Sequence, residues 1–330
     1  MTEFSPDLRD KPVFICGHPK AGTSLVRAIL DSHPQLIVYP EETVFFRRFL
    51  PQSVGLDLEA QLELAEKTLI HIFEWNQETP PLSQEGFPDR DYSSIAFEDV
   101  RQAFHERASE NYRHPGDILS AAVLAYGQIR DQVGSETLHW VEKSPYNEYF
   151  AEQIFTWWPE ARCIHVVRDP RDNYTSYRRK HPSWNPEFFA ANWRRSTQAG
   201  LQNARRFGPK YYRLLRYEDL TGSPDATLHQ LVDFLHIDWH PSLASPTRAG
   251  EGWAGNSMFA DQFQGISAAP VDRWKEELGT LDARVIELMI KSTLVECDYS
   301  PSYPNLPQSL AARWRVAAWP IRSRLKNVTK

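Results

Sequence analysis

The chain has 330 residues, of which 41% are apolar and 12% aromatic, so it can bury a substantial core and is not a disordered chain. Its 37 Lys and Arg residues and 43 Asp and Glu residues give a net charge of −6, which excludes a polycationic nucleic-acid binder. The cysteines Cys16, Cys163 and Cys297 are far apart and form no CxxC pair, which argues against a disulfide framework or zinc knuckle and favours a reducing compartment.

Short apolar runs, each followed by helix-like sequence, recur along the chain. They span residues 12–16, 36–39, 139–141, 162–167 and 211–215. This alternation of strand and helix is typical of a parallel sheet that is covered by helices on both faces. We therefore predict one α/β domain over residues 1–309, built on a P-loop-like parallel sheet of about five strands.

Two long segments interrupt this alternation. Residues of about 50–137, after the second strand, show helical patterns near 56–76, 95–111 and 116–133. They predict a helical insertion that could wall an acceptor pocket. Residues 236–272 are rich in Pro, Gly, Ser and Ala and show little periodicity, so we expect a lid loop there.

The two ends of the chain differ in charge and apolar character. The N-terminus has no basic start followed by an apolar stretch, and no run is long enough to cross a bilayer, so we expect a cytoplasmic protein. Residues 310–330 contain six Lys and Arg residues and no acid. This basic tail mixes tryptophans with cations, so it could contact an anionic membrane surface or a partner; the alternative is a terminal helix that is solvated or docked on the domain.

The stretch from Gly17 to Ser24 follows the first predicted strand and opens a helix. Backbone N–H groups converge on an anion in such a place. Its two glycines have the spacing of the nucleotide-triphosphate loop GxxxxGK[ST], but Thr23 stands where that loop has lysine, and the lysine is at position 20. The magnesium-dependent arrangement is therefore missing, and a smaller anion that needs no metal fits better. The alternative is a strand-to-helix turn capped by hydroxyl groups.

This loop resembles the phosphosulfate-binding loop of sulfotransferases, which use 3′-phosphoadenosine 5′-phosphosulfate (PAPS). The family pattern is a basic residue, any residue, Gly, Thr and then Thr or Ser. It is matched by Lys20, Ala21, Gly22, Thr23 and Ser24. The resemblance implies that these residues bind the donor, and that no metal is required.

A second anion site is predicted at the end of the fourth strand. Arg168 ends that strand and Ser176 follows eight residues later. Strand ends share one edge of a parallel sheet, so Arg168 should face the same crevice as the glycine loop. In sulfotransferases an Arg and a Ser with this spacing bind the 3′-phosphate of PAPS. The alternative is an ion pair from Arg168 to Asp169 or Asp172.

Two further positions are similar to nucleotide contacts of the family. Tyr217 matches a strand-end aromatic residue that lies near the adenine, although a core tyrosine would give the same pattern. Ser257 belongs to a late segment that resembles the loop closing over the nucleotide in bacterial members. The RKG triplet of cytosolic sulfotransferases is absent from this segment.

The acceptor side is predicted from the segment after the second strand. Residues 25–43, which end in Glu41, Glu42 and Thr43, look like the tyrosylprotein sulfotransferases and their bacterial relatives, in which a Glu of this motif is the base. The resemblance implies Glu42 as catalytic base, with Glu41 as second choice. Lys143, after the third strand, resembles a lysine near the transferring sulfuryl group, and Lys20 would assist it. The alternatives are carboxylates at a helix N-terminus and a solvated lysine.

Together these motifs indicate a PAPS-dependent sulfotransferase of bacterial type, similar to tyrosylprotein and carbohydrate sulfotransferases. The expected acceptor is a hydroxyl-bearing small molecule, lipid or glycan, and nucleic acid is not expected. None of the histidines forms a recognised ligand motif, so we predict no metal site. The alternatives are a P-loop nucleotide-dependent kinase and an inactive nucleotide-binding relative.

Overall fold

The computed structural model describes residues 8–76, 78, 90–110, 112–253, 255, 261–263, 265–302 and 309–328. Five parallel strands form the central sheet, in the order β2-β3-β1-β4-β5. They are β1 (Pro12–Gly17), β2 (Leu36–Val38), β3 (His139–Lys143), β4 (Arg162–Val167) and β5 (Tyr212–Arg216). The predicted five-stranded parallel sheet is confirmed.

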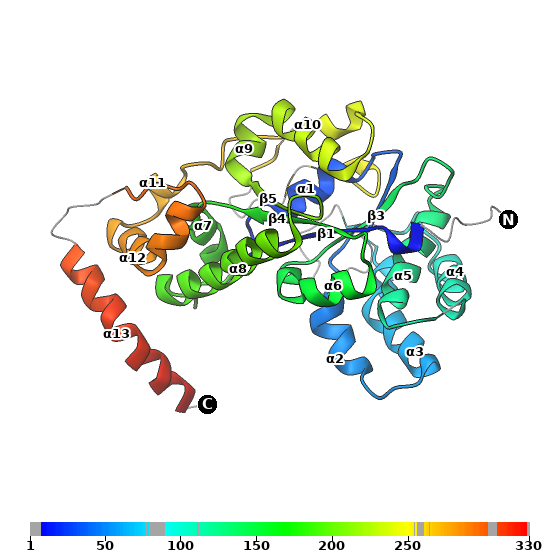
Figure 1. Ribbon diagram of the computed structural model, residues 1–330, viewed down its shortest axis with the longest axis horizontal. Helices are drawn as coiled ribbons and strands as arrows, with labels where there is room; N and C mark the ends of the chain where they lie inside the picture. Colours follow the sequence, from blue (N-terminus) through cyan, green and yellow to red (C-terminus); the bar gives the residue numbers. More distant parts are fainter. Residues whose placement is uncertain are drawn as a thin grey trace.

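Alternation along β1 assigns the two faces of the sheet. Val13 and Ile15 pack into one core cluster, while Phe14 and Cys16 pack into another on the opposite face. The first face is covered by α1 (Thr23–Leu30), α9 (Tyr217–Gly222) and α10 (Pro224–Leu235), which lie above the sheet in Figure 1. The sheet is therefore buried on both sides, which is why its strands read as apolar runs.

The opposite face carries the predicted helical insertion. Between β2 and β3 the chain forms a π-helical turn (Phe45–Phe49), α2 (Leu50–Ser53), α3 (Leu58–Thr68), α4 (Phe97–Ser109) and α5 (Gly116–Ile129). Figure 1 shows these helices on the lower right, next to α6 (Ala151–Trp157). The phenylalanines of the π-helical turn pack against Trp157 at the end of α6, so the insertion continues the main core.

A third helical group extends beyond β5. It contains α7 (Pro170–Lys180), α8 (Pro186–Phe207), α11 (Trp274–Glu277) and α12 (Thr280–Glu296). Helix α13 (Ser309–Val328) lies beside α12, at the lower left of Figure 1. Arg315 of α13 forms ion pairs with Glu187 and Asp282, so the first half of the basic tail is docked on the domain. Within the described residues, no helix has the length and apolar character needed to span a membrane.

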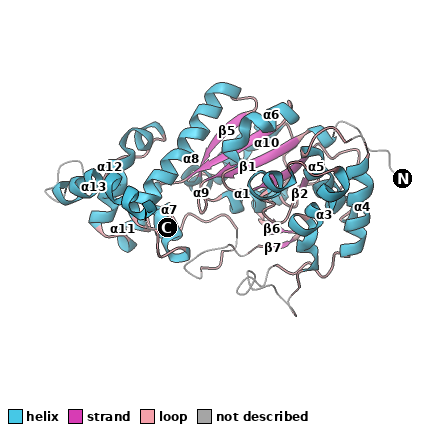
Figure 2. Cartoon of the chain, turned by 90° about the horizontal axis from the view of Figure 1, so that it is seen from below, coloured by secondary structure: helices cyan, strands magenta, loops and turns pink. Residues whose placement is uncertain are grey.

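The predicted lid contains little regular structure. Its described part holds a 3-10 turn (Pro241–Ala244) and a small antiparallel pair, β6 (Thr247–Arg248) and β7 (Glu251–Gly252). Figure 2 shows this pair beneath the sheet and close to α1. Side chains join the pair to α1, since Asp31 at its end accepts hydrogen bonds from the Thr247 hydroxyl and the Gly250 N–H group.

Candidate active site

The glycine loop depends on its two glycines for steric reasons. Gly17 has φ of 130°, and a β-carbon there would lie 2.4 Å from the carbonyl oxygen of Val166. Gly22 has φ of 105°, and a β-carbon there would lie 2.4 Å from the Tyr217 ring. Both conformations are in the region that favours glycine. The loop therefore turns sharply from β1 into α1, and the first N–H groups of that helix face outward without intrahelical partners.

Arg168, which follows β4, and Asn173 on α7 hold the loop by its carbonyl groups. The Asn173 amide donates to the Pro19 carbonyl at 2.9 Å, and the Arg168 guanidinium donates to the Lys20 carbonyl at 3.4 Å. Ala21 is predicted as a donor-binding residue, and in the structure its side chain is buried in the core while its N–H group donates to the His18 carbonyl at 3.1 Å. Ala21 thus supports the loop from within and does not reach the cavity.

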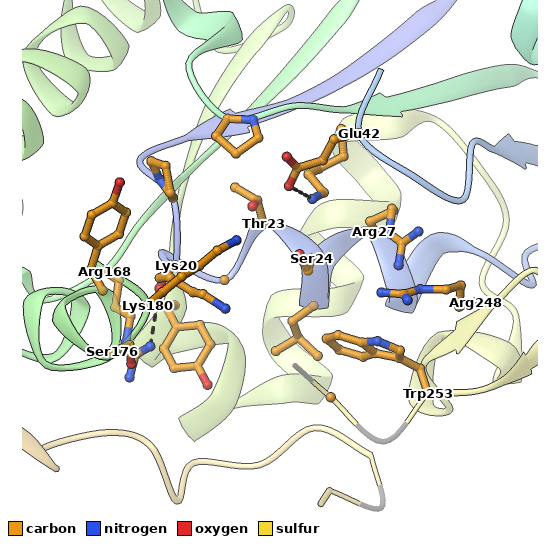
Figure 3. A pocket seen from close by; sticks show the side chains of 18 of the residues that line it. Lys20, Thr23, Ser24, Arg27, Glu42, Arg168, Ser176, Lys180, Arg248 and Trp253 are labelled. Atoms are coloured by element: carbon orange, nitrogen blue, oxygen red, sulfur yellow. Dashed lines mark hydrogen bonds and ion pairs between the residues drawn. The ribbon is translucent and has the colours of Figure 1, made fainter. Parts of the chain in front are cut away.

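A cavity of about 630 Å³ opens over this loop. It brings together most of the residues predicted from the sequence, several of which appear in Figure 3. The lining includes Lys20, Gly22, Thr23, Ser24, Glu41, Glu42, Lys143, Arg168, Ser176 and Tyr217. Ser257 lies outside the described residues.

One side of the cavity is formed by Arg168 and Tyr217. The guanidinium of Arg168 lies 4.5 Å from the centre of the Tyr217 ring and donates to the Pro270 carbonyl at 2.8 Å. Asp169 does not pair with Arg168, because both of its oxygens bind Arg171. Arg168 is therefore positioned between the glycine loop and the last residues of the predicted lid, with Ser176 on α7 lining the same cavity.

The adjacent carboxylates Glu41 and Glu42 have different surroundings. Glu42 pairs with Lys143, with 2.5 Å between Oε1 and Nζ, and 42% of its side chain is exposed. Glu41 is only 8% exposed, accepts a hydrogen bond from Tyr92 and pairs with Arg90 at 3.1 Å. Glu42 is thus the carboxylate that an entering molecule can reach.

The charges of the Glu42–Lys143 pair are mutually stabilised. Desolvation raises the pKa of Glu42, but the Lys143 ammonium outweighs it and the pKa lies below its ordinary value. Burial lowers the pKa of Lys143, and the Glu42 charge opposes that shift. The pair can therefore hold an ionised carboxylate, the protonation state that a general base needs.

A buried glutamate, Glu142, precedes Lys143 on β3 and fixes the segment that carries Glu42. Glu142 accepts hydrogen bonds from the hydroxyls of Thr43 and Ser144 at 2.7 and 2.6 Å, and from the Asn147 amide at 2.7 Å. Burial raises its pKa. Thr43 is thereby tied to the end of β3, which sets the position of the preceding Glu42. The sequence motif contains Glu142, but its role depends on contacts that only the fold brings about.

Lys20 supplies a second cation at the floor of the cavity. Its φ of 65° lies in the left-handed region, which is uncommon for a residue with a side chain. Burial, together with the smaller effect of the nearby cations Lys180 and Lys143, lowers the pKa of its amine to about 8. An anion bound here would favour the charged ammonium form.

A buried cluster of Cys16, Glu148 and His165 lies beneath the loop. Their potential ligand atoms lie within 4.8 Å of one another. Both oxygens of Glu148 are already used, because one accepts from the Gly17 N–H group at 3.0 Å and the other from the Ser196 hydroxyl. The arrangement thus ties the glycine loop to α8, and burial raises the pKa of Glu148 to about 7.

Several cavity residues were not predicted from the sequence. Cations and tryptophans are prominent among them: Arg27, Arg47, Trp75, Arg90, Lys180, Arg248, Trp253 and Arg273. Helical spacing could have identified two of these, since Arg27 follows Thr23 by four residues and Lys180 follows Ser176 by four, which places each pair on one helix face. Arg248 has no such signal, because it comes from a strand of two residues.

Comparison with known proteins begins with a family model described as the sulfotransferase family, which matches residues 12–241. Protein-tyrosine sulfotransferase A of Caenorhabditis elegans is 24% identical over 315 residues, which cover 91% of this chain and 71% of that protein. An uncharacterised protein of Aquifex aeolicus (strain VF5) is 24% identical over 273 residues, or 80% of this chain. The match spans only 30% of the Aquifex protein's length.

Two solved structures share the fold. The sulfotransferase domain from the curacin biosynthetic pathway has a TM-score of 0.56 and 18% identity, and the match covers 90% of this chain and 99% of that domain. The sulfotransferase domain from the Synechococcus PCC 7002 olefin synthase has a TM-score of 0.52 and 20% identity, covering 91% and 98%. The helix-flanked parallel sheet is thus an arrangement found in known sulfotransferases.

Proposed function

The chain belongs to the sulfotransferase family, and we propose that it transfers a sulfuryl group from PAPS to a hydroxyl group of an acceptor. One observation carries the proposal: a single cavity joins the start of α1, the Arg168–Ser176 pair and the Glu42–Lys143 pair. The first two are anion sites and the third is a base beside a cation. A donor that carries anions at two ends needs the first two parts, and a hydroxyl acceptor needs the third.

The donor side of the cavity suits a nucleotide with two separate anions. The N–H groups of Thr23 and Ser24 at the start of α1, together with Lys20, would bind the 5′-phosphosulfate. Arg168 and Ser176 would bind the 3′-phosphate, and Tyr217 would lie beside the adenine. Bound PAPS supplies the sulfuryl group. The chain itself has to bind and orient the donor and the acceptor, and to accept one proton.

The acceptor side supports an in-line displacement. Glu42 takes the hydroxyl proton as the acceptor oxygen bonds to sulfur and the bond between sulfur and the phosphate oxygen breaks. Lys20 and Lys143 offset the negative charge on the leaving oxygen and the sulfonate. Phosphoryl transfer by a P-loop kinase would need a lysine after Gly22, where this chain has Thr23.

The proposal is tested by a transfer assay with ³⁵S-labelled PAPS in the presence of EDTA. Acceptors are a panel of tyrosine peptides, phenols, sugars and lipid-linked glycans, and products are read by the mass gain of one sulfonate. Arg205→Met serves as a matched control, because Arg205 is an exposed arginine of α8 that pairs with Glu296 and is not among the residues that line the cavity.

We expect transfer that persists in EDTA and is unaffected in the control variant. Arg168→Met should weaken donor binding at least about tenfold, since it removes a charge-assisted phosphate contact. Magnesium-dependent transfer of the γ-phosphate of ATP, without transfer from PAPS, would refute the proposal.

A further inference from the structure

We propose that the acceptor carries an anionic group, a carboxylate, phosphate or sulfate, which binds between Arg27 and Arg248 while its hydroxyl faces Glu42. This inference rests on the proposed sulfotransferase function and names the class of its acceptor. It is carried by a buried cationic subsite on the side of the cavity away from the predicted nucleotide contacts.

Arg27 is the first part of this subsite. It lies on α1, one helical turn after Thr23, and lines the cavity although its side chain is only 2% exposed. Among the described residues, no hydrogen-bond partner is found for its Nε and Nη1 atoms. Leaving guanidinium donors buried and unsatisfied is costly, so a bound anion would recover free energy there.

Arg248 is the second part and comes from a different segment. It lies on β6, lines the same cavity and is 6% exposed. In Figure 3 the side chains of Arg27 and Arg248 approach one another above Trp253. The positive charge of Arg248 lowers the pKa of Arg27, after the larger effect of burial. The fold therefore holds two like charges together, which an anion between them would stabilise.

Two described carboxylates near the pair, Glu41 and Asp31, are engaged by other groups. Glu41 lies 3.7 Å from Arg248 but also pairs with Arg90. Asp31 is occupied by the Thr247 hydroxyl and the Gly250 N–H group. Both carboxylates therefore have hydrogen-bond or ion-pair partners other than Arg27.

The position of the subsite separates it from the donor. Figure 3 shows Lys20, Arg168 and Ser176 on one side of Thr23 and Ser24, with Arg27, Arg248 and Trp253 on the other. Arg27 lies close enough to lower the pKa of Lys143, the partner of Glu42. Arg27, Glu42 and Lys143 line one cavity, so an anion held by Arg27 would lie in the same cavity as the base. Trp253 and Trp75 line the same cavity and offer apolar surface to the connecting part of the acceptor.

A binding experiment tests the subsite without knowledge of the acceptor. The protein is saturated with adenosine 3′,5′-bisphosphate, and inorganic sulfate is then titrated into it by calorimetry. A chloride salt keeps the ionic strength constant. The variants are Arg27→Met, Arg248→Met and Lys143→Met, with Arg205→Met as the exposed control. Circular dichroism and bisphosphate affinity verify that each variant is folded. If Arg27→Met does not fold, the sulfate affinity of Arg248→Met, on the β6–β7 pair, tests the subsite instead.

We expect sulfate binding that weakens at least about tenfold in Arg27→Met and Arg248→Met, as expected for loss of a charge-assisted contact. The loss of sulfate affinity should be smaller in Lys143→Met than in either arginine variant, and Arg205→Met should show no loss. If wild-type protein binds the bisphosphate but does not bind sulfate, the subsite is refuted and the proposed function is not. If wild-type protein does not bind the bisphosphate, the proposed function is refuted. Sulfate binding that needs Lys143 but not the two arginines would place the anion at the transfer position and overturn the inference.

The transfer screen gives a second readout. For acceptors that it identifies, Arg248→Met should raise KM at least about tenfold and change kcat less than about threefold, because the subsite binds a group remote from the reacting oxygen. A neutral acceptor whose KM is the same in wild type and Arg248→Met would contradict the inference.

Discussion

Two neighbouring carboxylates at the end of β2 differ in what they can do. Glu41 is buried among Tyr92, Arg90 and Arg248, which use its oxygens to fix the local structure. Glu42 points into the cavity beside Lys143. The environment thus favours the second carboxylate as the proposed base, although both have the same chemistry.

The role of Glu42 predicts a separation of turnover from binding. Glu42→Gln removes the proton acceptor but keeps the shape, so kcat should fall by about 10² to 10⁴. The affinity for adenosine 3′,5′-bisphosphate, measured by calorimetry, should remain within about threefold, because Glu42 does not contact the predicted phosphate groups. Turnover within a few-fold of wild type would rule out this assignment.

Lys20 predicts proton uptake on nucleotide binding. Without ligand, burial holds the pKa of its amine near 8. Bound phosphates favour the ammonium form and raise that pKa, so a proton is taken up when the nucleotide binds above pH 8. Affinity should accordingly fall by up to about tenfold per pH unit above pH 8.

Calorimetry at pH 9 in buffers of different ionisation enthalpy measures this uptake. Lys20→Arg provides the comparison, because arginine stays charged at this pH and should exchange no proton. A binding heat that does not depend on the buffer in wild-type protein at pH 9 would show that Lys20 does not bind the anion.

Site residues next to strand ends could be predicted from the sequence, whereas residues defined by long-range contacts could not. Lys20, Arg168 and Glu42 follow apolar runs, so the parallel sheet alone brings them to one edge. The partnership of Arg27 with Arg248 depends on how a hairpin packs against α1. No pattern within a short stretch of the sequence predicts such packing.

At the scale of elements, β1 and its loop depend on a buried carboxylate. Glu148 accepts a hydrogen bond from the Gly17 N–H group, where β1 ends and the loop begins. It also binds Ser196 on α8, so one side chain joins the loop to a covering helix. Burial of this group has a cost that depends on its ionisation.

Glu148→Gln should change how stability depends on pH. Burial raises the pKa of Glu148 from 4.5 to about 7, so the folded state holds a proton that the unfolded state releases. The group's stabilising contribution is therefore present below pH 4.5 and is lost as pH rises towards 7. The free energy of unfolding should fall by up to about 3 kcal/mol through this change in ionisation. The glutamine of the variant does not ionise, so the variant should not show this fall.

Urea unfolding between pH 4.5 and 8 tests this expectation. The free energy of unfolding of Glu148→Gln, relative to wild type, should increase as pH rises to 7 and level off above it. Glu59→Gln, on the exposed side of α3, is the control and should show no such trend. A difference that stays constant across this range would show that Glu148 ionises normally.

The sheet could be predicted closely because each of its strands is buried on both faces. Predicted strands at 12–16 and 162–167 correspond to β1 and β4 almost residue for residue. The π-helical turn Phe45–Phe49 could not be predicted, because its geometry follows from aromatic packing against α6. Nor could the β6–β7 pair, whose strands of two residues are too short to show a period.

At the scale of the whole molecule, the contacts of α13 include two ion pairs of Arg315, the buried Ala312, and Trp319, whose ring centre lies 6.5 Å from that of Phe188. Ala312 is fully buried, and Arg315 binds both oxygens of Glu187 as well as Asp282. Figure 1 shows that the helix lies far from the glycine loop at the start of α1. Its attachment should therefore affect stability and leave the active site unchanged.

Arg315→Met tests the attachment. The substitution leaves the buried Glu187 carboxylate without this partner, so the free energy of unfolding should fall by about 1 to 3 kcal/mol. Donor affinity should not change. Arg313→Met, on the exposed face of the same helix, should have little effect on either quantity. Equal losses in the two variants would show that the ion pairs do not hold α13.

The central claim is that one cavity binds a nucleotide carrying anions at two ends, and titration calorimetry without magnesium tests it most directly. Adenosine 3′,5′-bisphosphate should bind with a Kd in the micromolar range or below, about −8 kcal/mol, and Arg168→Met should weaken it at least about tenfold. ATP, which lacks the 3′-phosphate, should bind much more weakly. Heat from ATP with none from the bisphosphate would contradict the account.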